Sequence, residues 1–162
     1  MKQKIKYRTM QSGEEEHIYD LVMKEFHRHV ALHYSKKGIE KFISMFSPEW
    51  LRKQGIGNDS FVIVSLQGKN IVGMAAVINK SHIALIFVDS KFQKKGIGKK
   101  LINEATKKCL EDNPSLNKIT VSSSPNSISF YYSLGFQTQG QEVNEDGMRF
   151  TPMGKKILQL KD

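Results

Sequence analysis

Ile83-Ala84-Leu85-Ile86-Phe87-Val88 is an unbroken apolar run, and after four intervening residues Gln93-Lys94-Lys95-Gly96-Ile97-Gly98 opens a lysine-rich segment. An apolar run without polar alternation predicts a β-strand that is buried on both faces. In the segment that follows, apolar side chains recur at every fourth position, which predicts an amphipathic helix. Those positions are Ile97, Leu101, Ala105 and Cys109. We therefore expect a strand, a glycine turn (residues 93–98) and a helix in direct succession.

The glycine turn has the composition of an anion-binding site. Gly96 and Gly98 lack side chains, so a ligand can approach the main chain closely. The first N–H groups of a helix have no partner within the helix, and together with the helix dipole they attract anions. Lys94, Lys95 and Lys99 add positive charge. The alternative interpretation is a tight structural turn within a basic patch.

Length and composition limit the class of protein. The 162 residues are 39% hydrophobic and 25% charged, which predicts one globular domain spanning residues 1–162. The eight-residue apolar run 71–78 is too short to cross a membrane, and no apolar segment typical of a secretory signal follows the N-terminal lysines. A lone cysteine, Cys109, can form neither an internal disulfide nor a cysteine metal cluster. A cytoplasmic location with no membrane partner is therefore expected.

The basic excess is concentrated in one place. The formal net charge is +9, and residues 91–108 contain seven lysines against one acid, Glu104. Nucleic-acid-binding surfaces usually spread Arg and Lys over a face with aromatic residues among them, whereas Phe92 is the only aromatic residue in this stretch. The cluster suits a small polyanion, and we expect no nucleic acid as a partner. A basic nucleic-acid-binding domain remains an alternative hypothesis.

The rest of the chain predicts a mixed α/β domain. Helices are expected from Ser12 or Gly13 to about residue 30, over 39–46 after a break at Gly38, from Ser47-Pro48 onward, and over 127–134. Strands are expected at 5–10, 61–66, 71–78 and 119–122, with a closing hairpin of 136–143 and 148–153. This order predicts a single sheet with helices on both faces.

Two stretches carry a family resemblance. Residues 86–98 resemble motif A of the GNAT (GCN5-related) N-acetyltransferases, and Asn126-Ser127-Ile128-Ser129-Phe130-Tyr131-Tyr132-Ser133-Leu134-Gly135-Phe136 resembles their later FY-x-x-LGF motif. The strand order agrees as well, so the resemblance covers nearly the whole chain, and residues 146–153 resemble a small bacterial branch. It implies the GNAT fold, with a single mixed, mostly antiparallel sheet.

The resemblance also implies an activity. The chain is expected to transfer the acetyl group of acetyl-CoA directly to the amine of a small molecule or to an exposed amino group, without a metal. A homodimer is a possible assembly in this family. The alternative is an acyl-CoA-binding module or sensor without catalytic turnover.

Roles follow for the residues that match the motifs. The pantetheine arm would pair with the main chain of 86–88, the pyrophosphate would sit on the glycine turn, and Asn126 would contact the pantetheine. The cofactor-binding set is thus Ile86, Phe87, Val88, Gln93, Lys94, Lys95, Gly96, Ile97, Gly98, Lys99 and Asn126. Tyr131 matches the family tyrosine near the coenzyme sulfur, whose role would be to donate a hydrogen bond or a proton to the departing thiolate. A buried structural aromatic is the alternative for Tyr131, and its neighbour Tyr132 is a weaker candidate.

No residue stands out as the general base. His82, Glu25 and His29 are the candidates. Glu25, His29 and His33 are spaced i, i+4, i+8 on the first predicted helix, where they would form a metal site, part of the acceptor pocket or ordinary surface. Val30 follows His29 where a zincin would have glutamate, so no metal site is expected.

The remaining reactive and aromatic residues receive simpler interpretations. Cys109 lies on the apolar stripe of its helix and is expected to be a buried, unreactive thiol. Three aromatic side chains are expected in the core, or as one wall of the acceptor pocket: Phe26, Phe46 and Trp50. The resemblance of residues 146–153 to the bacterial branch suggests that Arg149 contacts an acceptor carboxylate and Phe150 its apolar part.

Overall fold

The computed structural model describes residues 3–158. Its strands are β1 (Ile5–Thr9), β2 (Phe61–Gln67), β3 (Asn70–Ile78), β4 (His82–Val88), β5 (Lys118–Ser123), β6 (Gln137–Thr138), β7 (Val143–Glu145) and β8 (Met148–Lys156). Its α-helices are α1 (Glu15–Glu25), α2 (Lys36–Met45), α3 (Pro48–Ile56), α4 (Ile97–Asp112) and α5 (Ile128–Ser133). Short turns of other helix types are η1 (Phe26–Val30), η2 (Ala31–His33), η3 (Ser90–Phe92) and η4 (Pro125–Ser127).

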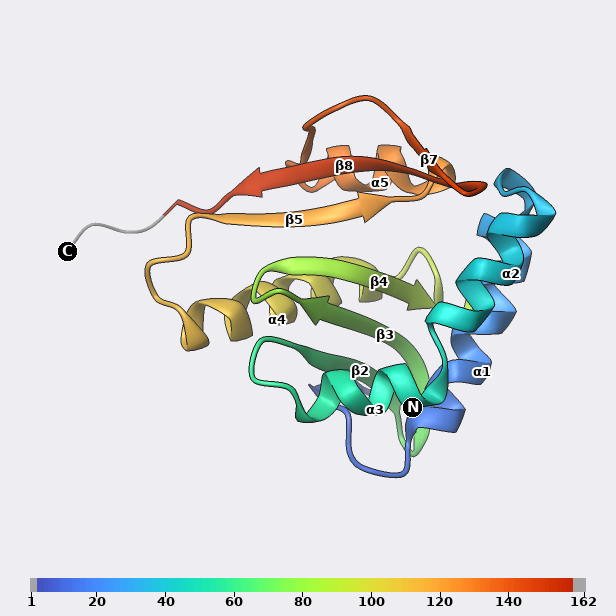
Figure 1. Cartoon of the computed structure of the whole chain (residues 1–162). Coiled ribbons are helices and arrows are strands. Elements are labelled where there is room, and N and C mark those ends of the chain that lie inside the picture. Colours follow the sequence, from blue (N-terminus) through green and yellow to red (C-terminus); the bar gives the residue numbers. More distant parts are fainter. Residues whose placement is uncertain (1–2, 159–162) are drawn as a thin grey trace.

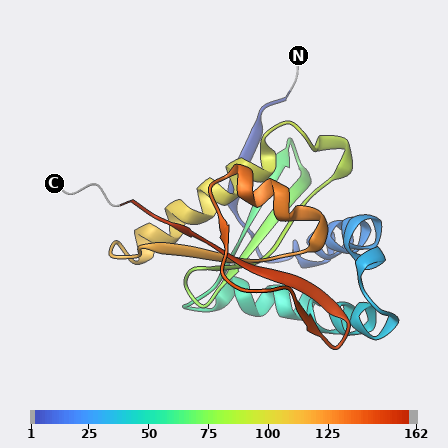
Figure 2. The same ribbon diagram turned by 90° about the horizontal axis from the view of Figure 1, so that it is seen from above.

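The strands form one twisted sheet with the order β1-β2-β3-β4-β5-β8-β6, and β7 pairs with β8 (Figure 1). Every pairing is antiparallel except that of β4 with β5. Helix α4 covers one face of the sheet, and α1, α2 and α3 cover the other, as Figure 2 shows from above. The predicted mixed, mostly antiparallel sheet with helices on both faces is confirmed.

Two apolar cores lie on opposite faces of the central strand β3. Ala75 and Val77 pack against Leu101 on the α4 side, and Met74 and Ala76 pack in the cluster that α1, α2 and α3 build on the other side. Successive side chains of a strand point to opposite faces, so a strand that is apolar throughout serves both cores.

The helix starts follow their capping residues. Ser47 accepts a hydrogen bond from the Trp50 N–H at 3.2 Å, with Pro48 in the first turn of α3, as predicted. Gly38, however, does not break a helix: α2 begins at Lys36 and Gly38 lies in its first turn. A side chain on Gly38 would overlap the main chain of Gly147, so this glycine allows α2 to approach the β7–β8 turn.

The first predicted helix changes pitch near its end. Helix α1 ends at Glu25, a π-turn (η1) follows, and the chain then tightens into the 3-10 turn η2. These pitches differ from 3.6 residues per turn, so the i, i+4, i+8 stripe does not continue to His33. His33 is the residue whose carbonyl oxygen accepts from Arg149 at 3.5 Å.

Strands β4 and β5 separate soon after they meet. Their parallel register contains His82↔Thr120 and Ile83↔Val121, and β4 continues to Val88 beyond this point. On its other edge β4 stays paired with β3, with a register shift that leaves Ala84 as an extra residue.

The split corrects the prediction that β4 is buried on both faces. Ile83 and Leu85 are buried, but Ala84 and residues 86–88 are only partly buried. The reason is that β4 loses its neighbour on one side, so its apolar side chains line a cavity in addition to packing against the two cores.

The closing hairpin is also more broken than predicted. The expected strand 136–143 exists as two pieces, β6 and β7, both paired with β8. The expected turn is present, with positive φ angles of 55° at Asp146 and 94° at Gly147. Within residues 3–158, we find no helix with the length and apolar character needed to cross a bilayer.

Candidate active site

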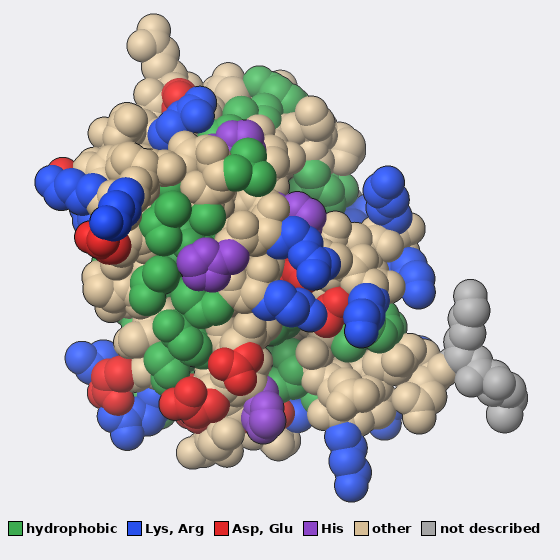
Figure 3. Space-filling model, turned by 90° about the vertical axis from the view of Figure 1, so that its right-hand side faces the viewer, with side chains coloured by type: hydrophobic (Ala, Val, Ile, Leu, Met, Phe, Trp, Pro, Cys, Tyr) green, Lys and Arg blue, Asp and Glu red, His purple; other side chains and the backbone are tan. Residues whose placement is uncertain are grey.

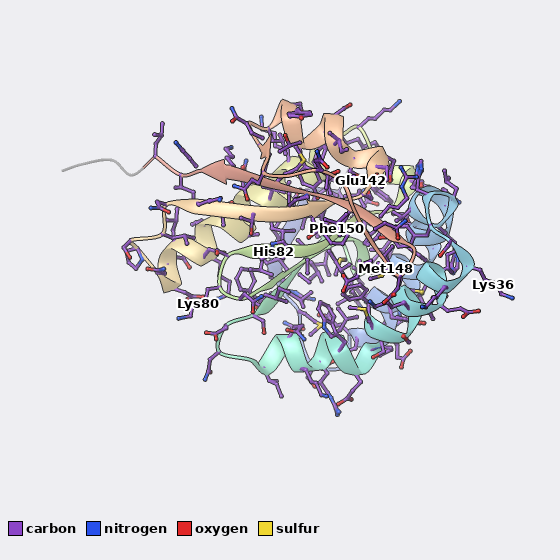
Figure 4. The ribbon with its side chains drawn as sticks, turned by 45° about the horizontal axis from the view of Figure 1, so that its top comes forward. Lys36, Lys80, His82, Glu142, Met148 and Phe150 are labelled. Carbon is purple, nitrogen blue, oxygen red and sulfur yellow. The ribbon has the colours of Figure 1, made fainter. Side chains whose placement is uncertain are left out.

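The split between β4 and β5 opens a cavity of about 820 Å³ that reaches both faces of the sheet. On the α4 side its lining comes from β4, the glycine turn, the end of β5, η4 and α5. On the α1–α2 side it comes from the end of α1, η1, α2 and the β7–β8 hairpin. In Figure 4, the labelled side chains of His82, Met148 and Phe150 show where β4 and β8 contribute to this lining.

The glycine turn presents main-chain N–H groups to one end of the cavity. Gly96 caps α4 in a left-handed conformation with a φ of 84°, and Lys94 has a φ of 63°. The main-chain N–H groups of residues 94–99 donate to no acceptor within residues 3–158. The next N–H along the chain, that of Lys100, donates to the Gly96 carbonyl. Such a row of free donors at a helix start suits an anion. The Gln93 side chain braces the turn by donating to the Val88 carbonyl at 2.9 Å.

The two glycines have different roles in the structure. A Cβ on Gly96 would meet no atom within 4 Å, so its side is open to a ligand. A Cβ on Gly98 would come within 3.1 Å of the Phe130 ring. Gly98 therefore permits close packing of α4 against α5, a reason that the local sequence did not indicate.

The predicted cofactor-binding residues meet at this cavity, with one exception. The lining includes Ile86, Phe87, Val88, Gln93, Lys94, Gly96, Ile97, Gly98, Lys99 and Asn126. Lys95 is not part of the lining, and its Nζ lies 5.4 Å from the centre of the Phe92 ring. The structure brings the set together, and its contact with a coenzyme stays a prediction.

Tyr131 lies in the cavity wall and is 2% exposed, between the rings of Phe130 and Phe136. Burial raises the pKa of its phenol, so the hydroxyl keeps its proton at neutral pH. Tyr132 is 50% exposed and is not part of the lining. The geometry therefore distinguishes the two neighbours, and a buried, protonated phenol can serve as a proton donor.

Glu25 ties the end of α1 to the segment before the glycine turn. This carboxylate is 1% exposed and accepts from the Ser90 N–H at 3.0 Å and from the Ser90 hydroxyl at 2.6 Å. His29 Nε2 lies 3.3 Å from both Glu25 Oε2 and Ser90 Oγ. Lys24 adds an ion pair to Asp89 at 2.8 Å. Sequence reasoning missed Ser90, for which the only local signal is the Asp89-Ser90 pair at the start of η3.

His82 links β4 to β5 at the point where the two strands are still paired. Its Nδ1 lies 2.7 Å from Thr120 Oγ1 and its Nε2 lies 3.1 Å from Ser122 Oγ. Burial lowers the pKa of the imidazole, because the charged form is poorly solvated there. His82 is thus a neutral side chain with both ring nitrogens engaged.

The α1–α2 side of the cavity is mainly apolar. We call this surface the acceptor wall, and it consists of Val30, Tyr34, Phe42, Met45, Phe46, Leu85, Phe87, Met148 and Phe150. Phe26 is a core residue instead, stacked on Phe42 at 3.8 Å between ring centres, and Trp50 is a partly buried residue that packs against this core. Arg149 is not part of the lining, and its guanidinium donates to Glu142 at 3.0 and 3.2 Å.

The thiol of Cys109 is buried, as predicted, and burial raises its pKa to about 11. It therefore remains a protonated thiol away from the cavity. Among residues 3–158, no three His, Cys, Asp or Glu side chains gather in a way that would hold a metal ion.

Three solved structures show how widely this architecture is shared. A GCN5-related N-acetyltransferase from Rhodopseudomonas palustris superposes with a TM-score of 0.81 at 16% identity, over 97% of this chain and 98% of that one. The PaiA N-acetyltransferase from Thermoplasma acidophilum, in complex with coenzyme A, gives 0.76 at 22% identity, over 95% and 99%. The aminoglycoside 6'-N-acetyltransferase from Enterococcus faecium gives 0.70 at 14% identity, over 97% and 99%.

At these identities the structural likeness establishes the fold. The family is established by the sequence itself, because residues 30–157 match the family model described as an acetyltransferase (GNAT) domain. The chain therefore belongs to the GNAT family of acetyltransferases, as an acyl-CoA-dependent N-acetyltransferase.

Proposed function

We propose that this protein transfers an acetyl group from acetyl-CoA to the amine of a small molecule or to an exposed amino group. The observation that carries the proposal is the split between β4 and β5, which connects the free N–H groups of the glycine turn to the acceptor wall through one cavity. A donor on one face of the sheet and an amine on the other can therefore meet within the split.

The donor would be held by main-chain groups and two lysines. The N–H groups of the glycine turn would bind the pyrophosphate, with Lys94 and Lys99 supplying positive charge. The edge of β4 over residues 86–88, to which no strand of residues 3–158 pairs on the split side, would pair with the pantetheine arm. The Asn126 side chain at the opposite wall would add a polar contact.

Direct transfer needs few groups from the protein. The amine nitrogen attacks the thioester carbonyl carbon, a C–N bond forms, and the C–S bond breaks. Tyr131 would give its phenolic proton to the departing thiolate and later recover one from solvent. The free N–H groups of β4 near Val88 would stabilise the negative charge that develops on the carbonyl oxygen.

We assign acceptance of the amine proton to His29. The two carboxylate oxygens of Glu25 already accept hydrogen bonds from Ser90, and both ring nitrogens of His82 are engaged. The side chain of His29 is 39% exposed and lines the cavity on the side of the acceptor wall. Glu25, 3.3 Å from its Nε2, would stabilise the imidazolium that results.

We also propose that residues 1–162 act as one catalytic domain in the cytoplasm. The continuous sheet from β1 to β8 supports a single unit, and the buried, unpaired Cys109 suits a reducing compartment. The lysine-rich stretch supports a small polyanion as its partner, because its two lining lysines are Lys94 within the glycine turn and Lys99 directly after it.

The decisive experiment follows release of the coenzyme A thiol while acetyl-CoA is incubated with a panel of amines. We expect thiol release that depends on both protein and amine, together with acetyl-CoA binding by titration calorimetry. Binding without any amine-dependent release would instead identify a non-catalytic acyl-CoA-binding module. The arm without amine measures background hydrolysis and serves as the control.

A further inference from the structure

The acceptor wall has little capacity to hold positive charge. Its nine side chains are aliphatic, aromatic or thioether groups, and Tyr34 carries the only polar atom among them. A band of hydrophobic side chains with histidines among them also runs down the outer surface on this side of the molecule (Figure 3). A cationic group placed against such a wall would lose hydration and find no anionic partner there, so only the faces of the aromatic rings would offset part of that cost.

Two carboxylates line the cavity among the described residues, and both have partners. Glu25 accepts two hydrogen bonds from Ser90. Glu145 lies at the end of β7, where its Oε1 is 3.5 Å from the ammonium of Lys41. Either carboxylate would therefore have to weaken an existing interaction in order to bind an ammonium group of the acceptor.

The overall charge acts in the same direction. The chain carries a formal net charge of +9, and Lys94 and Lys99 line the other end of the same cavity. A field of this sign reduces the local concentration of polycations and slows their association. A molecule with a single amine has one charge for the protein to repel, and it loses that charge when the amine is deprotonated before reaction. A polyamine keeps its remaining positive charges.

We propose that the acceptor is a monoamine whose body is apolar, an alkyl or aryl group that lies against the acceptor wall. This inference rests on the proposed function and defines the acceptor class for the same site. The reacting nitrogen would face His29 and the split, and the apolar body would contact Phe46, Met148 and Phe150. Polyamines and aminoglycosides, with several ammonium groups, would be poor acceptors.

A homologous series of acceptors tests the proposal directly. Values of kcat/KM are measured for n-propylamine to n-hexylamine and for 2-phenylethylamine, with spermidine and kanamycin as polycationic comparisons. We expect kcat/KM to rise about fourfold with each added methylene, which corresponds to about 0.8 kcal/mol per buried CH₂. The kcat/KM values for spermidine and kanamycin should not exceed the value for propylamine.

A matched pair of variants locates the effect at the wall. Phe150 lies in the cavity lining, and Val143, its cross-strand partner on β7, lies outside that lining. Phe150→Ala should flatten the chain-length dependence and lower kcat/KM for hexylamine about tenfold. Val143→Ala should retain the wild-type slope. Thermal unfolding and coenzyme A affinity, measured for both variants, show that each is folded.

The outcomes separate this inference from the proposed function. A flat series, a wild-type slope in Phe150→Ala, or faster transfer to spermidine or kanamycin than to hexylamine would overturn the assigned acceptor class while acetyl transfer itself stands. Failure to acetylate any amine, in a protein that binds acetyl-CoA, would overturn the proposed function and this inference with it.

Discussion

Replacing Gly96 by alanine tests whether the glycine turn binds the coenzyme. Gly96 has a φ of 84°, and a Cβ placed there would meet no protein atom within 4 Å. The methyl group would therefore cause no clash inside the protein. It would project instead into the open side of the turn, which is where we place the pyrophosphate.

Two separate costs follow from this geometry. A left-handed backbone costs an alanine about 1 kcal/mol, which lowers the Tm of a chain of this length by about 2–4 °C. Displacing the pyrophosphate enough to break one charge-assisted hydrogen bond costs about 1.5–3 kcal/mol of binding free energy. The Kd for coenzyme A should therefore rise roughly tenfold to 100-fold.

Gly13 supplies a matched control. It has a φ of 98°, again with no atom within 4 Å of an added Cβ, and it lies in the turn before α1, outside the cavity lining. Gly13→Ala should lose similar stability by thermal unfolding and keep the wild-type Kd by titration calorimetry. An unchanged Kd in Gly96→Ala, or an equal loss of affinity in both variants, would refute the assignment of the glycine turn.

Three further predictions concern single side chains of the cavity. Tyr131→Phe should lower kcat about 100-fold and leave coenzyme affinity unchanged, because only the donated proton is lost; steady-state rates equal to wild type would remove Tyr131 from the mechanism. Lys99→Ala should raise the Kd for coenzyme A about fivefold and weaken the dependence of that Kd on salt. The control is Lys100→Ala, because the ammonium of Lys100 pairs with Glu104 at 3.2 Å, and this variant should change neither quantity. Equal effects of the two variants would contradict the placement of Lys99 at the coenzyme. Because burial lowers the pKa of His82 from 6.5, the unfolded chain binds a proton that the folded chain does not, so the free energy of unfolding should fall as the pH drops below 6.5. In urea titrations at about pH 7.5 and 5, His82→Gln should lose less stability on acidification than wild type, and an equal loss would count against this origin.

Local patterns in the sequence predicted the elements whose causes are local. Ser47 and Pro48 begin α3 because a cap and a first-turn proline act within a few residues. The glycine turn was predicted for the same reason, since Gly96 and the start of α4 are adjacent. The sequence also predicted the general location of the site, because a glycine turn after an apolar strand is itself the anion-binding feature.

Contacts between distant residues were not predictable in this way. Glu25 and Ser90 are 65 residues apart, and nothing in either neighbourhood indicates that they meet. Gly98 was expected to serve a ligand and does line the cavity, but its close approach to Phe130 of α5 could not be predicted. Gly38 was expected to be a break before a helix, and it lies in the first turn of α2, against the main chain of Gly147. In each case the partner comes from another element, so the reason for the residue appears only when the elements pack.

The sequence by itself therefore determined the kinds of element, their order and the anion-binding turn, because hydrogen bonding and side-chain periodicity act over short distances along the chain. Only the tertiary structure decided that β4 and β5 part after Ile83, which turns apolar side chains of β4 into the walls of a cavity. Whether two strands stay paired depends on contacts between elements far apart in the chain, and such contacts leave no local signal in the sequence. The resulting cavity joins the glycine turn to the acceptor wall.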